Sequence, residues 1–213
     1  ELSKNYKNSQ FVVDVKSTGL FSTDDVLRSN NASVKFWKTG HSYIKQKTSE
    51  LGALAGFERS GHYFFNTPIG RGYDDACLSA IEVCKLLDQN PKKNLSDLIA
   101  QLPKTYNSPT MSPSCPDENK YQVMEGVVKV IKEKYKKNIK IADQEIISIL
   151  TINGIRFTLS DGSWGLVRAS SNTPNLVVVC ESPVSESIMK DIFMFIDEVL
   201  REFKDVGDYD QSI

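Results

Sequence analysis

Short apolar runs alternate with helical patterns along the first half of the chain. The runs are rich in Val, Phe or Ala and end in polar residues, which is typical of short buried strands. We expect strands at 11–18, 33–40 and 54–58. Apolar residues at helical spacing predict helices at 23–32, 41–53, 74–90 and 95–103. Because strands that alternate with helices form βαβ units, residues 1–108 are predicted to form a three-layer α/β domain with a mostly parallel sheet. Ser22 or Thr23 is the expected N-cap of the first of these helices.

The pattern changes near residue 108. Segment 107–120 holds three prolines in fourteen residues, which suits either a linker or an irregular edge strand. Beyond it, two helical patterns enclose a group of apolar runs. The helices are expected at 121–137 and 185–204, and three strands at 146–159, 164–170 and 175–182. Clustered strands between two helices predict a smaller α+β domain over residues 109–213, with an antiparallel sheet and both helices on one face.

The charge and the cysteines narrow the class of protein. A net charge of −1 gives no general attraction to nucleic acid or to an anionic membrane, so neither is expected as a partner. Cys77, Cys84, Cys115 and Cys180 form no Cys-x-x-Cys pair and fit no zinc spacing. We expect reduced, mostly buried thiols in a cytoplasmic protein. The chain starts without methionine, which favours a piece cut from something longer.

Polar side chains follow the third expected strand directly. Glu58, Ser60 and His62 alternate along the chain, so an extended segment would aim them in the same direction. A carboxylate and a hydroxyl placed in this way can bind neighbouring hydroxyls of a sugar. Gly61 would let the backbone approach the ligand, and the aromatic run at 63–65 would anchor the segment in the core. The alternative interpretation is a solvated turn with a helix-capping acid.

Cationic groups follow the ends of the neighbouring strands. Lys16 follows the first strand, and Lys38 and His41 follow the second. Because the carboxyl ends of parallel strands meet at one edge of a sheet, we expect these residues close to Glu58 and His62. A polar, partly cationic cluster of this kind suits a phosphorylated polyol. A metal site is disfavoured, since no carboxylate–histidine spacing fits a ligand set.

A second candidate site lies between two apolar runs in the second half. It consists of a guanidinium followed by hydroxyls and an amide: Arg168, Ser170, Ser171, Asn172 and Thr173. Such a set, together with the N–H groups of a turn, is a good phosphate cradle. The alternative is a hairpin turn that is merely rich in Ser and Asn.

Three stretches together resemble a known family. They are WKTGHSYIKQK (37–47), GFERSGHYFF (56–65) and WGLVRASSNTPNLVV (164–178), and the strand VVDVKST precedes them in fitting order and spacing. The chain resembles the α-D-phosphohexomutases, most closely the phosphomannomutase/phosphoglucomutase group. Enzymes of this family have four domains around one cleft, and each domain carries one functional loop. In chain order these are a serine loop, a Mg²⁺ loop, a Glu-x-Ser-Gly-His loop and an Arg-x-Ser loop. This chain resembles the third and fourth domains only.

The resemblance implies an isomerase. The full enzyme would interconvert hexose 1-phosphate and hexose 6-phosphate through hexose 1,6-bisphosphate, with Mg²⁺ bound by the missing N-terminal domains and no metal ligand in this chain. Glu58 and Ser60 would grip sugar hydroxyls, and Arg168 and its loop would clamp the distal phosphate. Lys16, His41 and His62 would handle charge and protons. The loop is one residue longer than in many relatives, so the phosphate contact among residues 171–173 stays open.

Three readings of the whole chain follow from the resemblance. The first is the C-terminal half of a phosphomannomutase/phosphoglucomutase, inactive by itself. The others are the same half of a phosphoglucosamine mutase, and a stand-alone sugar-phosphate-binding protein without catalytic activity.

Overall fold

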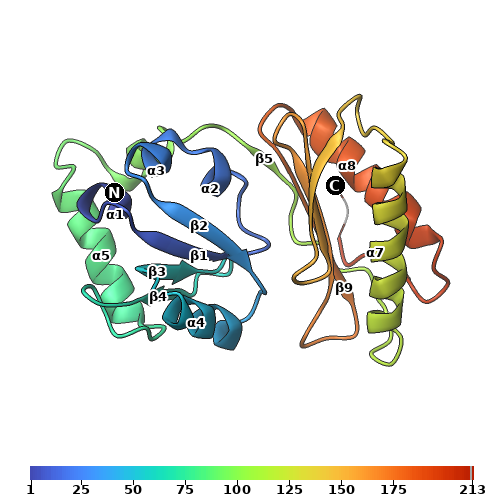
Figure 1. Cartoon of the computed structure of the whole chain (residues 1–213), viewed down its shortest axis with the longest axis horizontal. Coiled ribbons are helices and arrows are strands. Elements are labelled where there is room, and N and C mark those ends of the chain that lie inside the picture. Colours follow the sequence, from blue (N-terminus) through green and yellow to red (C-terminus); the bar gives the residue numbers. More distant parts are fainter. Residues whose placement is uncertain (212) are drawn as a thin grey trace. The chain divides into compact units, whose positions relative to one another are not determined.

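The computed structural model describes residues 1–211 and 213, which form two compact units, Glu1–Lys104 (unit 1) and Thr105–Ile213 (unit 2) (Figure 1). The units have nearly the same length, so the second is not the smaller one that we predicted. The boundary lies earlier than predicted because Tyr106 and Asn107, which we had placed in the first domain, pair with Ser182 and Glu181 in the sheet of unit 2.

Unit 1 contains a four-stranded sheet in the order β2-β1-β3-β4. Its strands are β1 (Gln10–Asp14), β2 (Ser33–Trp37), β3 (Ala55–Phe57) and β4 (Tyr63–Phe65). β1 pairs in parallel with β2 and β3, and β4 runs antiparallel to β3. The predicted mostly parallel sheet is therefore confirmed, and the carboxyl ends of β1, β2 and β3 lie at one edge.

Helices cover both faces of this sheet, as the three-layer prediction requires. The helices of unit 1 are α1 (Leu2–Asn5), α2 (Leu20–Thr23), α3 (Asp25–Ser29), α4 (His41–Glu50), α5 (Ala76–Asp88) and α6 (Leu95–Ile99), and four of them pack on the sheet. On one face, Ile44 of α4 packs with Val12 and Phe64. On the other, side chains of α1, α3 and α5 pack against Phe11 and Phe65. Each layer buries apolar residues of the same short strands, which is why β1 is apolar on both faces.

The start of α3 differs from the prediction. Asp24, not Ser22 or Thr23, is the N-cap, and its side chain accepts a hydrogen bond from the N–H of Leu27 (2.8 Å). Residues 20–23 form the separate short helix α2, so their hydroxyls lie too early in the chain to cap α3.

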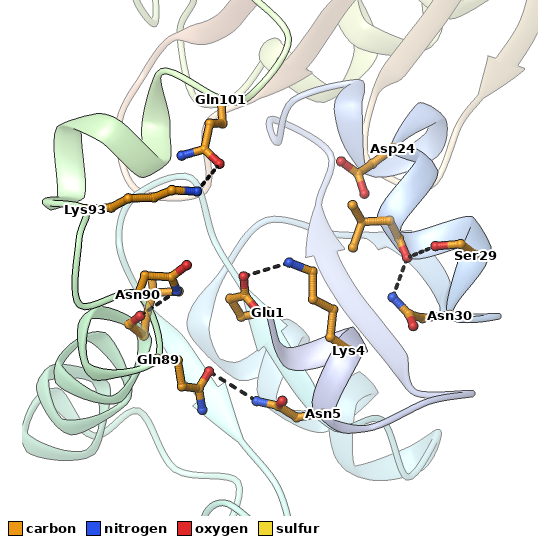
Figure 2. Close-up of polar contacts among 12 residues, drawn as sticks. Glu1, Lys4, Asn5, Asp24, Ser29, Asn30, Gln89, Asn90, Lys93 and Gln101 are labelled. Atoms are coloured by element: carbon orange, nitrogen blue, oxygen red, sulfur yellow. Dashed lines mark hydrogen bonds and ion pairs between the residues drawn. The ribbon is translucent and has the colours of Figure 1, made fainter.

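Helix α5 lies at the surface, and none of its residues is fully buried. Cys77 and Cys84 are consequently exposed, whereas Cys115 and Cys180 are buried, so the expectation of mostly buried thiols holds for one pair only. Figure 2 shows polar contacts near this helix: Asn5 of α1 donates a hydrogen bond to Gln89 (3.4 Å). Because this pair is exposed, the apolar contacts of Leu2 and Leu78 contribute more to holding the layer.

Unit 2 contains a five-stranded antiparallel sheet in the order β5-β9-β8-β7-β6. Its strands are β5 (Tyr106–Asn107), β6 (Ile146–Leu150), β7 (Ile155–Leu159), β8 (Trp164–Ala169) and β9 (Leu176–Ser182). Helices α7 (Lys120–Lys136) and α8 (Glu186–Arg201) lie on the same face of the sheet (Figure 1). Their apolar residues form one core with the strands, which confirms the predicted α+β arrangement.

Strand pairing shows the structure of two segments of unit 2 that the sequence left as one strand or as an open choice. Segment 146–159, which we expected as one strand, is a hairpin of β6 and β7. The proline-containing segment is an irregular edge strand: β5 pairs with β9, and buried Met111 bridges Val178.

Nothing in the described part of the chain forms a helix that is both long and apolar enough to span a bilayer.

Candidate functional site

A buried carboxylate joins the loops at the carboxyl edge of the sheet in unit 1. Asp14, the last residue of β1, has no exposed surface. Its Oδ1 accepts hydrogen bonds from Ser17 Oγ (2.7 Å) and from the N–H of Arg59 (3.3 Å). Its Oδ2 accepts one from Thr39 Oγ1 (3.0 Å) and lies 4.0 Å from Lys16 Nζ. The side chain therefore fixes the segments after three strands. Our site prediction omitted Asp14, although an acid inside a buried apolar run was a usable signal.

The Glu58–His62 segment is a tight turn and not an extended strand. Phe57 and Tyr63 are paired across the β3–β4 hairpin, and the N–H of Glu58 donates to the carbonyl of His62 (2.9 Å). Gly61 has a φ of +90° with open space around it, which suits the reversal. The predicted alternation of side chains is therefore wrong, because β4 returns antiparallel to β3. The anchoring is as expected for Phe64 and Phe65, which are buried, whereas Tyr63 is exposed.

Glu58 is the buried member of this turn, with 5% of its surface exposed. Its Oε2 accepts a hydrogen bond from the N–H of Gly40 (3.2 Å), and its Oε1 is buried without a hydrogen-bond partner among the described residues. Burial and the neighbouring Asp14 carboxylate raise the pKa of Glu58, against the lowering effect of Gly40, His62 and Lys16. A buried oxygen without a partner is unfavourable, so this atom is suited to accept a hydrogen bond from a ligand.

The two histidines lie beside each other, with ring centroids 5.9 Å apart. His62 Nδ1 lies 2.6 Å from Oδ2 of Asp74, and His41 Nε2 lies 3.7 Å from the same oxygen. His41 also packs edge-on against Phe64, at a centroid distance of 4.9 Å. The structure thus brings together the histidines that we predicted from separate segments. It adds Asp74, which the sequence analysis included only as the first position of the helix expected at 74–90.

The other predicted residues of unit 1 differ in their surroundings. The side chain of Lys16 is 12% exposed and lies next to Asp14. Ser60 and Gly61 are exposed at the tip of the turn. Lys38 Nζ lies 5.4 Å from the ring centroid of Tyr43, in a cation–π contact with the first turn of α4.

The predicted phosphate loop connects β8 and β9 in unit 2. Ser170 organises it: its Oγ accepts hydrogen bonds from the N–H groups of Asn172 (3.4 Å) and Thr173 (3.3 Å). The same Oγ lies 2.7 Å from Thr173 Oγ1. Ser171 and Asn172 are exposed. Ser170 is therefore a structural centre of the loop as well as a candidate ligand.

Arg168 lies at the end of β8 and is 7% exposed. Its Nη1 donates a hydrogen bond to the carbonyl of Ala169 (2.9 Å). Because the side chain is buried and does not face an open cleft, its replacement is expected to affect folding as well as binding. The guanidinium is held beside Ala169, the last residue of β8, which restricts its orientation.

Two further residues support the loop. Lys120 of α7 is buried, and its Nζ donates to the carbonyl of Thr173 (3.1 Å) and pairs with Asp117 (2.6 Å). Gly154, in the β6–β7 turn, has a φ of +73°, and a Cβ there would lie 2.6 Å from Arg168 Cα. Glycine is thus required for this turn to pass against the backbone of Arg168. Neither residue was predicted, because their contacts are distant in the sequence.

The described residues contain no group of three or more His, Cys, Asp or Glu side chains that could hold a metal ion. Asp74 with its two histidines does not form such a group.

Comparison with known proteins gives a family match for each unit. The family model for phosphoglucomutase/phosphomannomutase alpha/beta/alpha domain III matches residues 1–106, and that for the C-terminal domain matches 114–199. The phosphomannomutase/phosphoglucomutase of Pseudomonas putida is 30% identical over 90% of this chain and 38% of its own length. This chain therefore spans less than two fifths of that relative.

Solved structures agree with the sequence matches. A phosphoglucomutase/phosphomannomutase family protein of Burkholderia thailandensis superimposes with a TM-score of 0.75 at 26% identity, over 98% of this chain and 40% of that one. The N-acetylphosphoglucosamine mutase of Aspergillus fumigatus, solved with glucose 1,6-bisphosphate, shares the fold at 13% identity and a TM-score of 0.57, over 93% of this chain and 39% of that one. The same enzyme has also been solved with GlcNAc-6P and magnesium, at 12% identity and a TM-score of 0.56, over 90% of this chain and 41% of that one.

Both units thus have the fold of the α-D-phosphohexomutases. The chain belongs to the phosphoglucomutase/phosphomannomutase family, and it contains that family's domain III and C-terminal domain.

Proposed function

We propose that this chain is the sugar- and phosphate-binding half of an enzyme that interconverts hexose 1-phosphate and hexose 6-phosphate through a bisphosphate. The observation that carries the proposal is Glu58: one oxygen of its buried carboxylate has no hydrogen-bond partner among the described residues. This oxygen lies in a turn whose tip exposes Ser60 and Gly61. A sugar hydroxyl would donate to Glu58 Oε1, and Ser60 would bind a neighbouring hydroxyl.

The remaining candidate residues of unit 1 would transfer a proton or stabilise the charge of a phosphate. Lys16, His41 and His62 are candidates for handling the proton of the reacting hydroxyl or the charge of a phosphate. Lys38 is a candidate substrate contact at the start of α4. These roles are supported by how close the groups lie. Both histidine rings lie near the same oxygen of Asp74, and the charges of Lys16 and His62 lower the pKa of Glu58.

The loop after β8 would bind the phosphate that does not react. Arg168 would provide a planar pair of donors, and Ser170 would hold the loop in shape. Ser171 and Asn172 are exposed, and Thr173 has its hydroxyl beside Ser170, so Ser171 and Asn172 are the better candidates for direct contact.

The proposed cofactors follow the Aspergillus fumigatus relative, whose structures contain glucose 1,6-bisphosphate and magnesium. We propose hexose 1,6-bisphosphate as the intermediate. Mg²⁺ would be bound by the domains that the relatives have and this chain does not span, since no group of ligands occurs among its described residues. Those domains are the proposed partners of this chain.

Binding experiments with the 213-residue chain test the proposal. Glucose 6-phosphate, glucose and inorganic phosphate are titrated separately and followed by amide shifts in NMR spectra. We expect glucose 6-phosphate to bind more tightly than either fragment, with shifts around both Glu58 and Arg168. Equal affinity for glucose 6-phosphate and inorganic phosphate would show that the sugar turn has no role. The chain alone should give no mutase turnover with glucose 1-phosphate, Mg²⁺ and glucose 1,6-bisphosphate, because the serine that would donate the phosphoryl group belongs to another domain. Turnover above a blank would contradict this part of the proposal.

A further inference from the structure

The carboxylate of Asp74 is held at both oxygens by the β3–β4 hairpin. Oδ1 accepts a hydrogen bond from the N–H of Tyr63 (3.2 Å), and Oδ2 lies 2.6 Å from Nδ1 of His62. The backbone of Asp74 is also fixed, because this residue forms an isolated bridge with buried Phe64. Asp74 precedes Asp75, which is the N-cap of α5, so it does not cap the helix itself.

The charge of Asp74 decides which nitrogen of His62 carries the proton. Partial burial would raise the pKa of Asp74, but the hydrogen bonds from His62 and from the N–H of Tyr63 outweigh it and lower that pKa. An ionised carboxylate can only accept hydrogen bonds. His62 Nδ1 must therefore be the donor, and in the neutral ring Nε2 carries the lone pair.

We propose that Asp74 is a positioning residue that holds His62 in the Nδ1–H form, so that Nε2 is available to the ligand. This inference deepens the proposed function and rests on it: Nε2 would accept a hydrogen bond, or the proton itself, from a sugar hydroxyl. The resulting imidazolium would be stabilised by the same carboxylate. A carboxylate that fixes the tautomer of a catalytic histidine acts in this way in serine proteases.

The other charged groups near His62 are compatible with this role. His41 Nε2 lies 3.7 Å from Oδ2 of Asp74, so the second ring shares the carboxylate without replacing His62. Glu58 interacts electrostatically with His62 from the opposite end of the turn, and Lys16 acts on Glu58. Among the described contacts, Asp74 is the only carboxylate within hydrogen-bond distance of the His62 ring.

The test measures the tautomer directly. Long-range ¹H–¹⁵N spectra of the 213-residue chain at about pH 8 separate protonated from unprotonated ring nitrogens, and the chain has only two histidines. We expect His62 in the Nδ1–H form in the wild type. Asp74→Asn keeps an oxygen for the N–H of Tyr63 but can present an amide donor to Nδ1, so His62 should change to the Nε2–H form. The matched control is Asp75→Asn, which removes the same charge one residue away and keeps a capping side chain.

Three results would overturn the proposal. His62 could carry its proton on Nε2 in the wild type, or its tautomer could be unchanged in Asp74→Asn. In the third, glucose 6-phosphate binds but leaves the Nε2 resonance of His62 unshifted, and Asp74 is then structural only. The tautomer is measured without ligand, so an absence of glucose 6-phosphate binding would refute the proposed function and leave the assignment of Asp74 standing as a separate result.

Discussion

The N–H of Gly40 donates a hydrogen bond to Oε2 of Glu58 (3.2 Å), and this bond joins two loops of unit 1 at a buried carboxylate. Gly40 immediately precedes His41 at the start of α4, and Glu58 begins the turn that carries His62. One side chain therefore sets the distance between the two segments that hold the histidines. A change at Glu58 is expected to affect stability and ligand binding in opposite directions.

Glu58→Gln should stabilise the chain at neutral pH. The pKa of Glu58 is raised in the folded state by burial and by Asp14, so its contribution to stability is fully present below its unfolded pKa and is lost as the pH rises through the folded value. Gln removes this loss and can still accept the hydrogen bond from Gly40. We expect a melting temperature higher by a few degrees at pH 7, and almost no difference at pH 4, from circular dichroism.

The control for this prediction is Glu50→Gln. Glu50 is an exposed acid of the same unit, and hydrogen bonds from Lys47 and Gln46 lower its pKa, so the sign of its pH dependence is opposite. Its substitution should change the melting temperature little. A larger gain for Glu58→Gln at pH 4 than at pH 7 would contradict the prediction. Glu58→Gln should also bind glucose 6-phosphate more weakly than the wild type does.

Arg168→Ala should weaken the binding of glucose 6-phosphate by roughly tenfold to a hundredfold, the loss expected for a charge-assisted hydrogen bond worth about 1.5–3 kcal/mol. Arg168→Lys should recover part of the affinity, because it keeps the charge and loses the planar fork. Since Arg168 is buried and bonded to Ala169, the Ala variant should also lose some stability. Calorimetry well below the melting temperature separates the two effects.

Arg201→Ala is the matched control for Arg168. Arg201 lies on α8, is half exposed and pairs with Asp197 (3.2 Å). The Arg201→Ala variant should bind glucose 6-phosphate as the wild type does. Wild-type affinity in Arg168→Ala would mean that the loop is a hairpin turn without a role in binding.

Ser170→Ala should destabilise unit 2 by about 1–2 kcal/mol, because it removes the oxygen that accepts from two N–H groups of the loop. Ser171→Ala, at an exposed neighbour, should change the free energy of unfolding by less than about 0.5 kcal/mol. Urea unfolding followed by the amide resonances of unit 2 measures both. Equal effects of the two substitutions would show that the hydrogen bonds of Ser170 do not hold the loop.

Gly154→Ala should destabilise unit 2 by about 2–5 kcal/mol, since the new methyl group would meet the backbone of Arg168 at a left-handed φ. Gly162→Ala is the control: its φ is +88°, but the nearest atom to an added Cβ is 3.5 Å away. It should cost only about 1–2 kcal/mol. The same urea unfolding experiment applies, and equal losses at both glycines would rule out the close approach as the cause.

The sequence by itself determined the class of each half and most of its longer helices and strands. Buried strands and amphipathic helices have periodicities that depend on neighbouring residues, so the α/β and α+β halves were predicted correctly, together with the residues that mark the family. The sequence also predicted that Lys16, Glu58 and the two histidines lie near one edge of the sheet in unit 1, because parallel strands place their carboxyl ends together.

Tertiary structure alone decided how these residues meet. The reversal at Gly61 follows from the pairing of β4 with β3, and the burial of Arg168 and the exposure of Cys77 follow from packing. Asp14 contacts Arg59 across 45 positions, and Lys120 reaches Thr173 across 53. No local pattern encodes such contacts, because each depends on where the rest of the chain has folded.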